Sequence, residues 1–242
     1  MFNIETFTSH NNFQNFEKQI IESLYEQNPT LRIERKQLTL KFALLEVQIN
    51  ELLNVARSYN VKHARMIETQ LNCGLRVNEI VHLSIDQVNI EGKYLRIEAR
   101  EKDRYVDKFV PKTKCSNRII PLSERTANIL REQIGKRKKG YVFPSNKGGH
   151  YNKTSVIRFI NKYARICKTI RHNIGSHSLR RTFASYLISD PKRMPEDRQI
   201  TISDICRLLG HKSIKTTMEY LFNIVSLVEF EKIRASIDRM HN

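Results

Sequence analysis

Residues 176–221 constrain the fold of this chain more than any other stretch, because they place His177, Arg180, His211 and Tyr220 around one glycine, Gly210. His211 and Tyr220 are so far apart in sequence that one unbroken helix would separate them by about 13 Å, at roughly 1.5 Å per residue. Gly210 is a natural helix end, and Ser213 can cap a new helix. The sequence therefore predicts two helices whose connecting turn brings His211 and Tyr220 together.

The beginning of the same stretch predicts a helix that presents His177 and Arg180 on one face. The two residues stand three apart, and the segment 179–187 continues with helical character. One substrate group could therefore touch both side chains. The plainer interpretation is a surface His-Arg pair, which the spacing alone does not distinguish from a site.

A second arginine lies in a similar context upstream. Gly74 interrupts one helical segment, and Arg76 opens the next, which is expected to run through Leu83. An arginine in the first turn of a helix, beside free backbone N–H groups, is well placed to grip a phosphate. The alternative is a surface arginine that pairs with Glu79.

The remaining pattern predicts a mainly α chain with a small antiparallel β-sheet, that is, an α+β fold. Apolar residues recur at helical spacing in several segments, which are 13–24, 42–56, 64–71, 127–134, 153–169, 202–209 and 230–240. Ser123 is expected to cap the helix that contains residues 127–134. Alternating or extended character predicts three strands, which are 94–98, 108–110 and 118–122. The polar residues 111–116 then form the turn between the last two strands.

Charge restricts the partners of the protein. The chain contains 42 Lys and Arg residues against 25 Asp and Glu, so its net charge is +17. Such an excess favours a polyanionic partner, but charge alone does not separate DNA from RNA or an anionic membrane.

No apolar run approaches the ~20 residues of a membrane-spanning helix and no secretion signal is evident, so a cytosolic protein is expected. The four cysteines are scattered, which predicts reduced thiols and no zinc site.

Taken together, these motifs resemble the tyrosine recombinase (phage integrase) family. The matching residues are Gly-Leu-Arg-x-x-Glu at 74–79, Lys-Thr before x-x-Ser-x-Arg-x-Ile-Pro at 112–121, His-x-x-Arg at 177–180, and Leu-Gly-His followed by tyrosine at 209–220. The resemblance implies a catalytic set, with one runner-up for its lysine. The set is Arg76, Lys112 (or Lys114), His177, Arg180, His211 and the nucleophile Tyr220.

The resemblance also implies an activity, which is site-specific recombination of double-stranded DNA through a 3′-phosphotyrosine intermediate and a four-way junction. It implies no cofactor, metal ion or ATP, a homo-tetramer assembled on DNA, accessory DNA-binding proteins, and a cytoplasmic, DNA-associated location. Two alternatives stay open: a type IB topoisomerase that relaxes supercoils, and a catalytically idle DNA-binding relative.

Three regions are expected along the chain. Residues 1–37 form a short N-terminal segment with one amphipathic helix, residues 38–226 form the catalytic domain, and residues 227–242 form a C-terminal helix. Family members of full length carry a longer DNA-clamping domain before the catalytic domain. The C-terminal helix either packs on its own domain or docks on a neighbouring protomer.

Overall fold

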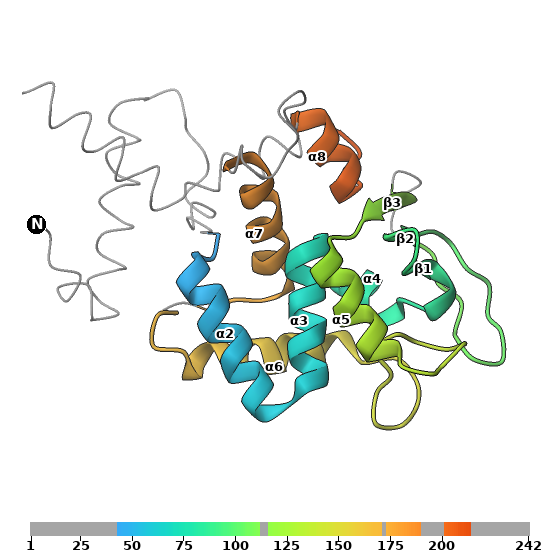
Figure 1. Cartoon of the computed structure of the whole chain (residues 1–242), viewed down its shortest axis with the longest axis horizontal. Helices are drawn as coiled ribbons and strands as arrows, with labels where there is room; N and C mark the ends of the chain where they lie inside the picture. Colours follow the sequence, from blue (N-terminus) through green and yellow to red (C-terminus); the bar gives the residue numbers. More distant parts are fainter. Residues whose placement is uncertain (1–42, 112–115, 171–172, 190–200, 214–242) are drawn as a thin grey trace, which may run out of the picture. The chain divides into compact units, whose positions relative to one another are not determined.

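The computed structural model describes residues 43–111, 116–170, 173–189 and 201–213 (Figure 1). Several expectations lie outside the described residues. They are the N-terminal helix within 1–37, the turn that carries Lys112 and Lys114, the helix that leads into Tyr220, and the C-terminal helix 227–242.

The described part is mainly helical, with one small sheet. Its helices are α2 (Glu46–Tyr59), α3 (Val61–Cys73), α4 (Val77–His82), the 3-10 helix η2 (Ile85–Gln87), α5 (Glu124–Ile134), α6 (Lys153–Ile166), α7 (Ser176–Ser189) and α8 (Ile202–Leu209). Its strands are β1 (Val88–Asn89), β2 (Tyr94–Ile97) and β3 (Arg118–Pro121). The predicted fold class, mainly α with a small antiparallel sheet, is confirmed. None of the described helices combines the length and the hydropathy that crossing a bilayer requires.

Helix α3 forms the centre of the helical core, and it packs against α2, α5 and α7 (Figure 1). Its burial extends beyond one apolar stripe, because the polar residues Glu68, Thr69 and Gln70 are buried as well. Buried polar side chains need partners, and Glu68 receives hydrogen bonds from Arg57 and Arg125 at 2.7 Å each. The ion pairs therefore join α2 and α5 to the central helix.

Local capping explains several of the helix boundaries. Ser123 accepts a hydrogen bond from the Thr126 backbone N–H, so its predicted role as the N-cap of α5 is confirmed. Thr201 and Asp204 form a reciprocal capping box at the start of α8. The α8 helix ends at Gly210, whose φ of 60° places it in the left-handed region, and this agrees with the predicted helix end.

Gly74 ends α3 and lets the chain turn sharply towards Arg76. Its φ is 60°, and a Cβ atom at this position would lie 2.4 Å from Cδ1 of Phe183. Phe183 belongs to α7, so α7 can approach the end of α3 only because Gly74 has no side chain. This close approach brings the two arginine-bearing segments next to each other.

The sheet differs from the expected arrangement. Its strand order is β1-β2-β3 and both pairs are antiparallel, with β2 beside β3 through pairs such as Leu95 with Ile120. The predicted strand 108–110 is wrong, because in this segment only Phe109 pairs, in an isolated bridge with Arg100. The bridge does not lengthen because Asp103 accepts hydrogen bonds from two following backbone N–H groups and turns the chain, while Pro111 lacks an N–H group.

The helices predicted within the described residues are confirmed, but their ends are shifted. The first core helix begins at Glu46, with Leu45 as its N-cap, so it starts later than the apolar stripe indicates. Helix α6 ends at Ile166, three residues before the predicted end, and buries its predicted inward residues, which are Val156, Phe159, Ile160 and Tyr163. Helix α7 is longer than the predicted segment 179–187 at both ends.

Candidate active site

Arg76 and Arg180 converge on the C-terminal end of α8, although they come from distant parts of the chain. Nη2 of Arg76 donates a hydrogen bond to the Gly210 carbonyl oxygen at 2.8 Å. Nη2 of Arg180 donates to the preceding carbonyl, that of Leu209. The end of a helix carries partial negative charge and unsatisfied carbonyl groups, so two guanidinium groups are stabilised there.

The two arginines differ in exposure, and the difference follows from their positions. Arg180 lies within α7 and is 2% exposed, and its Nη1 also donates to the Gly74 carbonyl at 2.6 Å. Arg76 is the N-cap residue of α4, and its side chain is 22% exposed. Arg76 therefore presents more of its guanidinium to an incoming group than Arg180 does.

Glu79 is the buried counter-charge of this cluster. Its carboxylate accepts hydrogen bonds from Nη1 of Arg76 at 2.8 Å and from both Nη1 and Nη2 of Arg118, at 2.9 and 2.8 Å. Nη1 of Arg180 lies 3.9 Å from the same carboxylate. Burial alone would raise the pKa of Glu79, but the hydrogen bonds and charge of Arg118, with smaller contributions from Arg180 and Arg76, lower the pKa to about 2. Glu79 is therefore ionised at neutral pH.

His211 follows directly after the helix end to which the arginines bind. Its backbone N–H donates to the Cys206 carbonyl at 3.0 Å, which fixes the turn after Gly210. Burial lowers the pKa of His211 to about 4, and the charges of Arg180, Arg76 and Arg118 act in the same direction. The imidazole is neutral at pH 7, so it can act through a hydrogen bond and not through a positive charge.

A pH dependence of stability follows from His211 and from His63, whose pKa is also lowered to about 4, chiefly by burial. An unfolded histidine titrates near pH 6.5, so between pH 4 and 6.5 the unfolded chain binds more protons than the folded one. The free energy of unfolding is therefore expected to be complete above pH 6.5 and to fall as the pH falls towards 4. Thermal melting measured from pH 7 down to 4.5 checks this, and His63→Gln and His211→Gln should each flatten the slope. Unchanged slopes in both variants would contradict the assignment.

The structure brings together only part of the predicted site. Arg76, Arg180 and His211 meet at the end of α8, as described above. His177 lies one turn before Arg180 on α7 and is exposed, whereas Arg180 is buried, so their predicted common face holds two very different environments. Lys112, with its runner-up Lys114, and Tyr220 lie outside the described residues.

The sequence assigns no role to Arg118, and it presents Glu79 as part of the Gly-Leu-Arg-x-x-Glu motif and as a possible surface partner of Arg76. Arg118 is buried in the cluster, and its Nε donates to the Leu208 carbonyl at 2.7 Å. A signal was present, because Arg118 belongs to the Ser-x-Arg-x-Ile-Pro segment that follows the lysine turn. The alternating pattern of that segment predicts an edge strand, but it does not indicate that the Arg118 side chain points towards α4.

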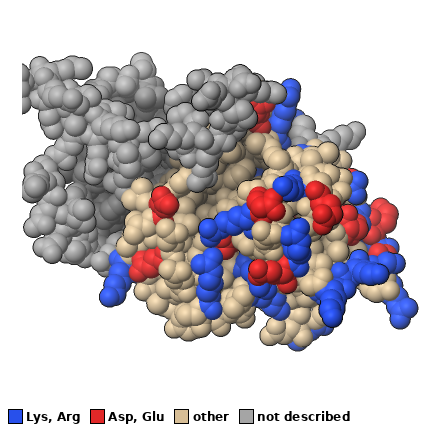
Figure 2. Space-filling view, viewed as in Figure 1, with Lys and Arg blue, Asp and Glu red and all other residues tan. Residues whose placement is uncertain are grey.

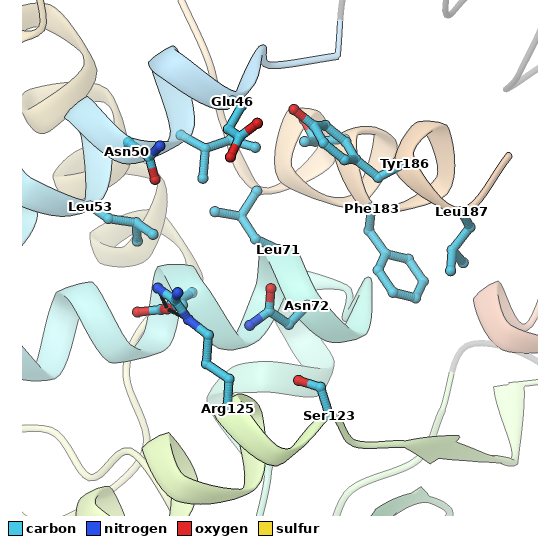
Figure 3. Close-up of a pocket in the computed structure, with 13 residues that line it drawn as sticks. Glu46, Asn50, Leu53, Leu71, Asn72, Ser123, Arg125, Phe183, Tyr186 and Leu187 are labelled. Carbon is cyan, nitrogen blue, oxygen red and sulfur yellow. Dashed lines mark hydrogen bonds and ion pairs between the residues drawn. The ribbon is translucent and has the colours of Figure 1, made fainter. Parts of the chain in front are cut away.

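A hollow of about 570 Å³ lies apart from the arginine cluster (Figure 3). Figure 3 shows Phe183 and Leu187 pointing into it from α7, with Ser123 and Arg125 at the start of α5 on the opposite side. One of its charged groups, Arg125, forms an ion pair with the buried Glu68. Across the described ranges, no three His, Cys, Asp or Glu side chains are placed so that they could hold a metal ion.

Charge on the surface is mixed. Figure 2 shows Lys and Arg side chains spread over the visible face of the described part, with Asp and Glu side chains among them. Exposed pairs such as Lys93 with Glu124 and Lys108 with Glu101 are examples of this mixing. The visible face of the described part therefore does not form one continuous basic stripe.

The fold of the described part is that of tyrosine recombinases in solved structures. A crystal structure of XerA recombinase matches with a TM-score of 0.61 and 21% identity over 80% of this chain and 64% of that one. The Tn1549 transposon integrase, solved in complex with circular intermediate DNA, matches with a TM-score of 0.63 and 18% identity over 98% of this chain and 82% of that one. At these identities the likeness concerns the fold.

The chain belongs to the phage integrase family, whose model matches residues 43–223. Among curated relatives, the tyrosine recombinase XerC of Pelobacter propionicus is 26% identical over 203 residues, which cover 82% of this chain and 57% of that protein. A tyrosine recombinase of Pseudothermotoga lettingae is 27% identical over 218 residues, covering 88% of this chain and 68% of that protein. The matched part thus spans 57% and 68% of the lengths of these two relatives.

Proposed function

We propose that this protein is a site-specific DNA recombinase that cleaves and rejoins double-stranded DNA through a covalent 3′-phosphotyrosine intermediate. The observation that carries the proposal is the convergence of Arg76 and Arg180 beside the neutral His211. Family membership and the recombinases among its relatives support it. The arrangement suits a reaction in which negative charge grows on a phosphate.

In the proposed cleavage step, the Tyr220 oxygen attacks the scissile phosphorus. The new P–O bond to tyrosine forms as the bond to the 5′-oxygen breaks, so the energy of the phosphodiester is kept and no ATP is consumed. His177 either accepts the tyrosine proton or contacts the phosphate, and Lys112, or its runner-up Lys114, donates a proton to the leaving 5′-oxygen. General acid-base assistance of this kind contributes roughly 10²–10⁴-fold in rate.

Arg76 and Arg180 stabilise the pentavalent transition state in this proposal. Planar guanidinium groups bind the non-bridging oxygens with two parallel hydrogen bonds, and they remain charged throughout the reaction. His211 donates a hydrogen bond that orients the phosphate, in line with its lowered pKa and neutral form. Rejoining reverses these steps with a 5′-hydroxyl from the partner strand, which leads through a four-way junction.

The outer face of α6 supplies a DNA contact in the same proposal. Arg158, Lys162 and Arg165 line an open hollow with Asn161 between them. Cationic and amide side chains of this kind bind phosphates and base edges in the major groove. The basic run 135–140 adds sequence-independent phosphate contacts, and a homo-tetramer with accessory DNA-binding proteins would complete the recombining complex.

The experiment that tests the function is covalent trapping. The full chain is incubated with nicked duplex fragments from its own genomic neighbourhood, denatured, and examined for a protein–DNA adduct. We expect an adduct with the wild-type protein and none with Tyr220→Phe, because phenylalanine has no nucleophilic oxygen. Tyr105→Phe, which alters an exposed tyrosine in a loop, should form the adduct normally.

Each of the other outcomes would assign a different activity or a different nucleophile to the protein. Tight binding to DNA without an adduct would favour a catalytically idle DNA-binding relative. An adduct at many unrelated sequences, together with relaxation of supercoiled DNA, would favour a type IB topoisomerase. An adduct that persists in Tyr220→Phe would assign the nucleophile to another residue.

A further inference from the structure

Arg118 lies at the first position of β3, and each nitrogen of its guanidinium donates a hydrogen bond inside the protein. Its side chain is 5% exposed. Nε donates to the Leu208 carbonyl at 2.7 Å, Nη1 donates to the Ser116 carbonyl at 2.9 Å, and Nη1 and Nη2 bind the Glu79 carboxylate in a bidentate pair. All three nitrogen atoms of the Arg118 guanidinium therefore donate to protein oxygens within the cluster.

Glu79 transmits the position of Arg118 to Arg76. Oε1 of Glu79 accepts from Nη1 of both arginines, at 2.8 Å for Arg76 and 2.9 Å for Arg118. Oε2 accepts from the Arg76 backbone N–H at 2.7 Å and from Nη2 of Arg118 at 2.8 Å. The bidentate pair fixes the plane of the carboxylate, so it also fixes the direction in which Arg76 is held.

The guanidinium groups of Arg76, Arg118 and Arg180 bind three consecutive carbonyl groups at the end of α8. Arg118 binds Leu208, Arg180 binds Leu209, and Arg76 binds Gly210. His211 follows directly after these residues. Arg118 therefore holds the helix end that carries His211 as well as the carboxylate that orients Arg76.

We propose that Arg118 is a positioning residue for strand cleavage, acting on Arg76 through Glu79 and on His211 through the Leu208 carbonyl. This inference rests on the proposed function. In this inference Arg76 and Arg180 contact the phosphate, and Arg118 holds Glu79 and the end of α8 in place. A purely structural ion pair would stabilise the fold without setting the rate of the chemical step.

The first test compares Arg118→Met with the wild-type protein in single-turnover adduct formation on nicked duplex DNA, at saturating protein. We expect cleavage to slow by about 10²-fold, since a misplacement of about 1 Å in a reacting group can have this effect. The affinity for DNA should stay close to the wild-type value, because Arg118 does not reach the surface. Arg96→Met is the matched control, because this exposed arginine on the neighbouring strand pairs with Glu98 outside the cluster.

A second substrate gives a readout that a structural role would not change. In a methylphosphonate linkage at the scissile position, a methyl group replaces one non-bridging oxygen and removes the negative charge that Arg76 and Arg180 stabilise. If Arg118 acts by positioning arginine, most of the defect of Arg118→Met should disappear on this neutral linkage. An equal defect on both substrates would overturn the proposal.

Arg118→Lys keeps the positive charge but loses the planar guanidinium that binds Glu79 with two hydrogen bonds. This variant replaces Arg118→Met in the test if the methionine variant does not fold. It should be folded, slow on the phosphodiester, and largely restored on the methylphosphonate. Wild-type rates in either folded variant, or failure of both variants to fold, would make Arg118 a structural residue and overturn the inference. Failure of the proposed function is distinct, because the wild-type protein itself would then form no adduct.

Discussion

Replacement of Glu79 by alanine is expected to lower the free energy of unfolding by about 3–5 kcal/mol, the usual effect of removing one partner of a buried ion pair. Glu79 is 4% exposed and is the counter-charge of Arg76, Arg118 and Arg180. Without it, three guanidinium groups remain close together, and the partners described for them are uncharged carbonyl and hydroxyl oxygens. Urea denaturation at pH 7 measures the change.

Glu132→Ala is the matched control for this prediction. Glu132 also pairs with an arginine, Arg65, at 2.7 Å, but its side chain is 65% exposed. Exposed ion pairs contribute about 0–1 kcal/mol, so this variant should be close to the wild-type protein in stability. If Glu79→Ala and Glu132→Ala changed the stability equally, the central role of Glu79 would have to be abandoned.

Replacement of Arg180 by methionine is expected to slow strand cleavage by about 10²–10³-fold, the range observed when one electrostatic donor of a transition state is removed. Methionine is of similar length but supplies no donor and no charge. The carbonyl oxygens of Gly74 and Leu209 would also lose their partner, so stability should fall by about 1–3 kcal/mol. Single-turnover adduct formation well below the melting temperature separates the two effects.

Arg65→Met controls for the loss of an arginine in general. Arg65 belongs to α3 and pairs with the exposed Glu132, outside the cluster around Glu79. Its cleavage rate should equal that of the wild-type protein. A wild-type rate in folded Arg180→Met would show that the buried guanidinium contributes to the fold and not to the chemistry.

The charge balance of the cluster explains why these effects are expected to be large. Three arginines and one glutamate leave an excess of two positive charges near the end of α8. The carbonyl groups of Leu208, Leu209 and Gly210 offset part of that excess through the helix dipole. A phosphate would supply the remaining negative charge, which agrees with the proposed function.

The sequence predicted those features that arise from local interactions. Ser123 caps α5 and Gly210 ends α8 because each needs only hydrogen bonds and backbone angles of its immediate neighbours. The inward face of α6 follows from helical spacing alone. Arg76, Arg180 and His211 were selected through their motifs, and the structure brings these three together.

The short strands were predicted less well, because their pairing depends on distant partners. The segment 108–110 has extended character, yet the strand that pairs with β2 on its other side is β1, which has only two residues. A two-residue strand has no period to detect. Strand β3 pairs with one edge of β2, so β1 pairs with the backbone groups on the other edge of β2.

The amino-acid sequence by itself therefore determined the helices of the described part, the cap at Ser123, the helix end at Gly210 and the identity of three members of the candidate site. Only the tertiary structure decided that Glu79 is a buried hub and that Arg118 joins it. Arg118 is 39 residues from Glu79 and 90 residues from Leu208, and no local pattern encodes a contact over such separations. The physical reason is burial: a charged side chain removed from water must find its partners wherever the fold places them.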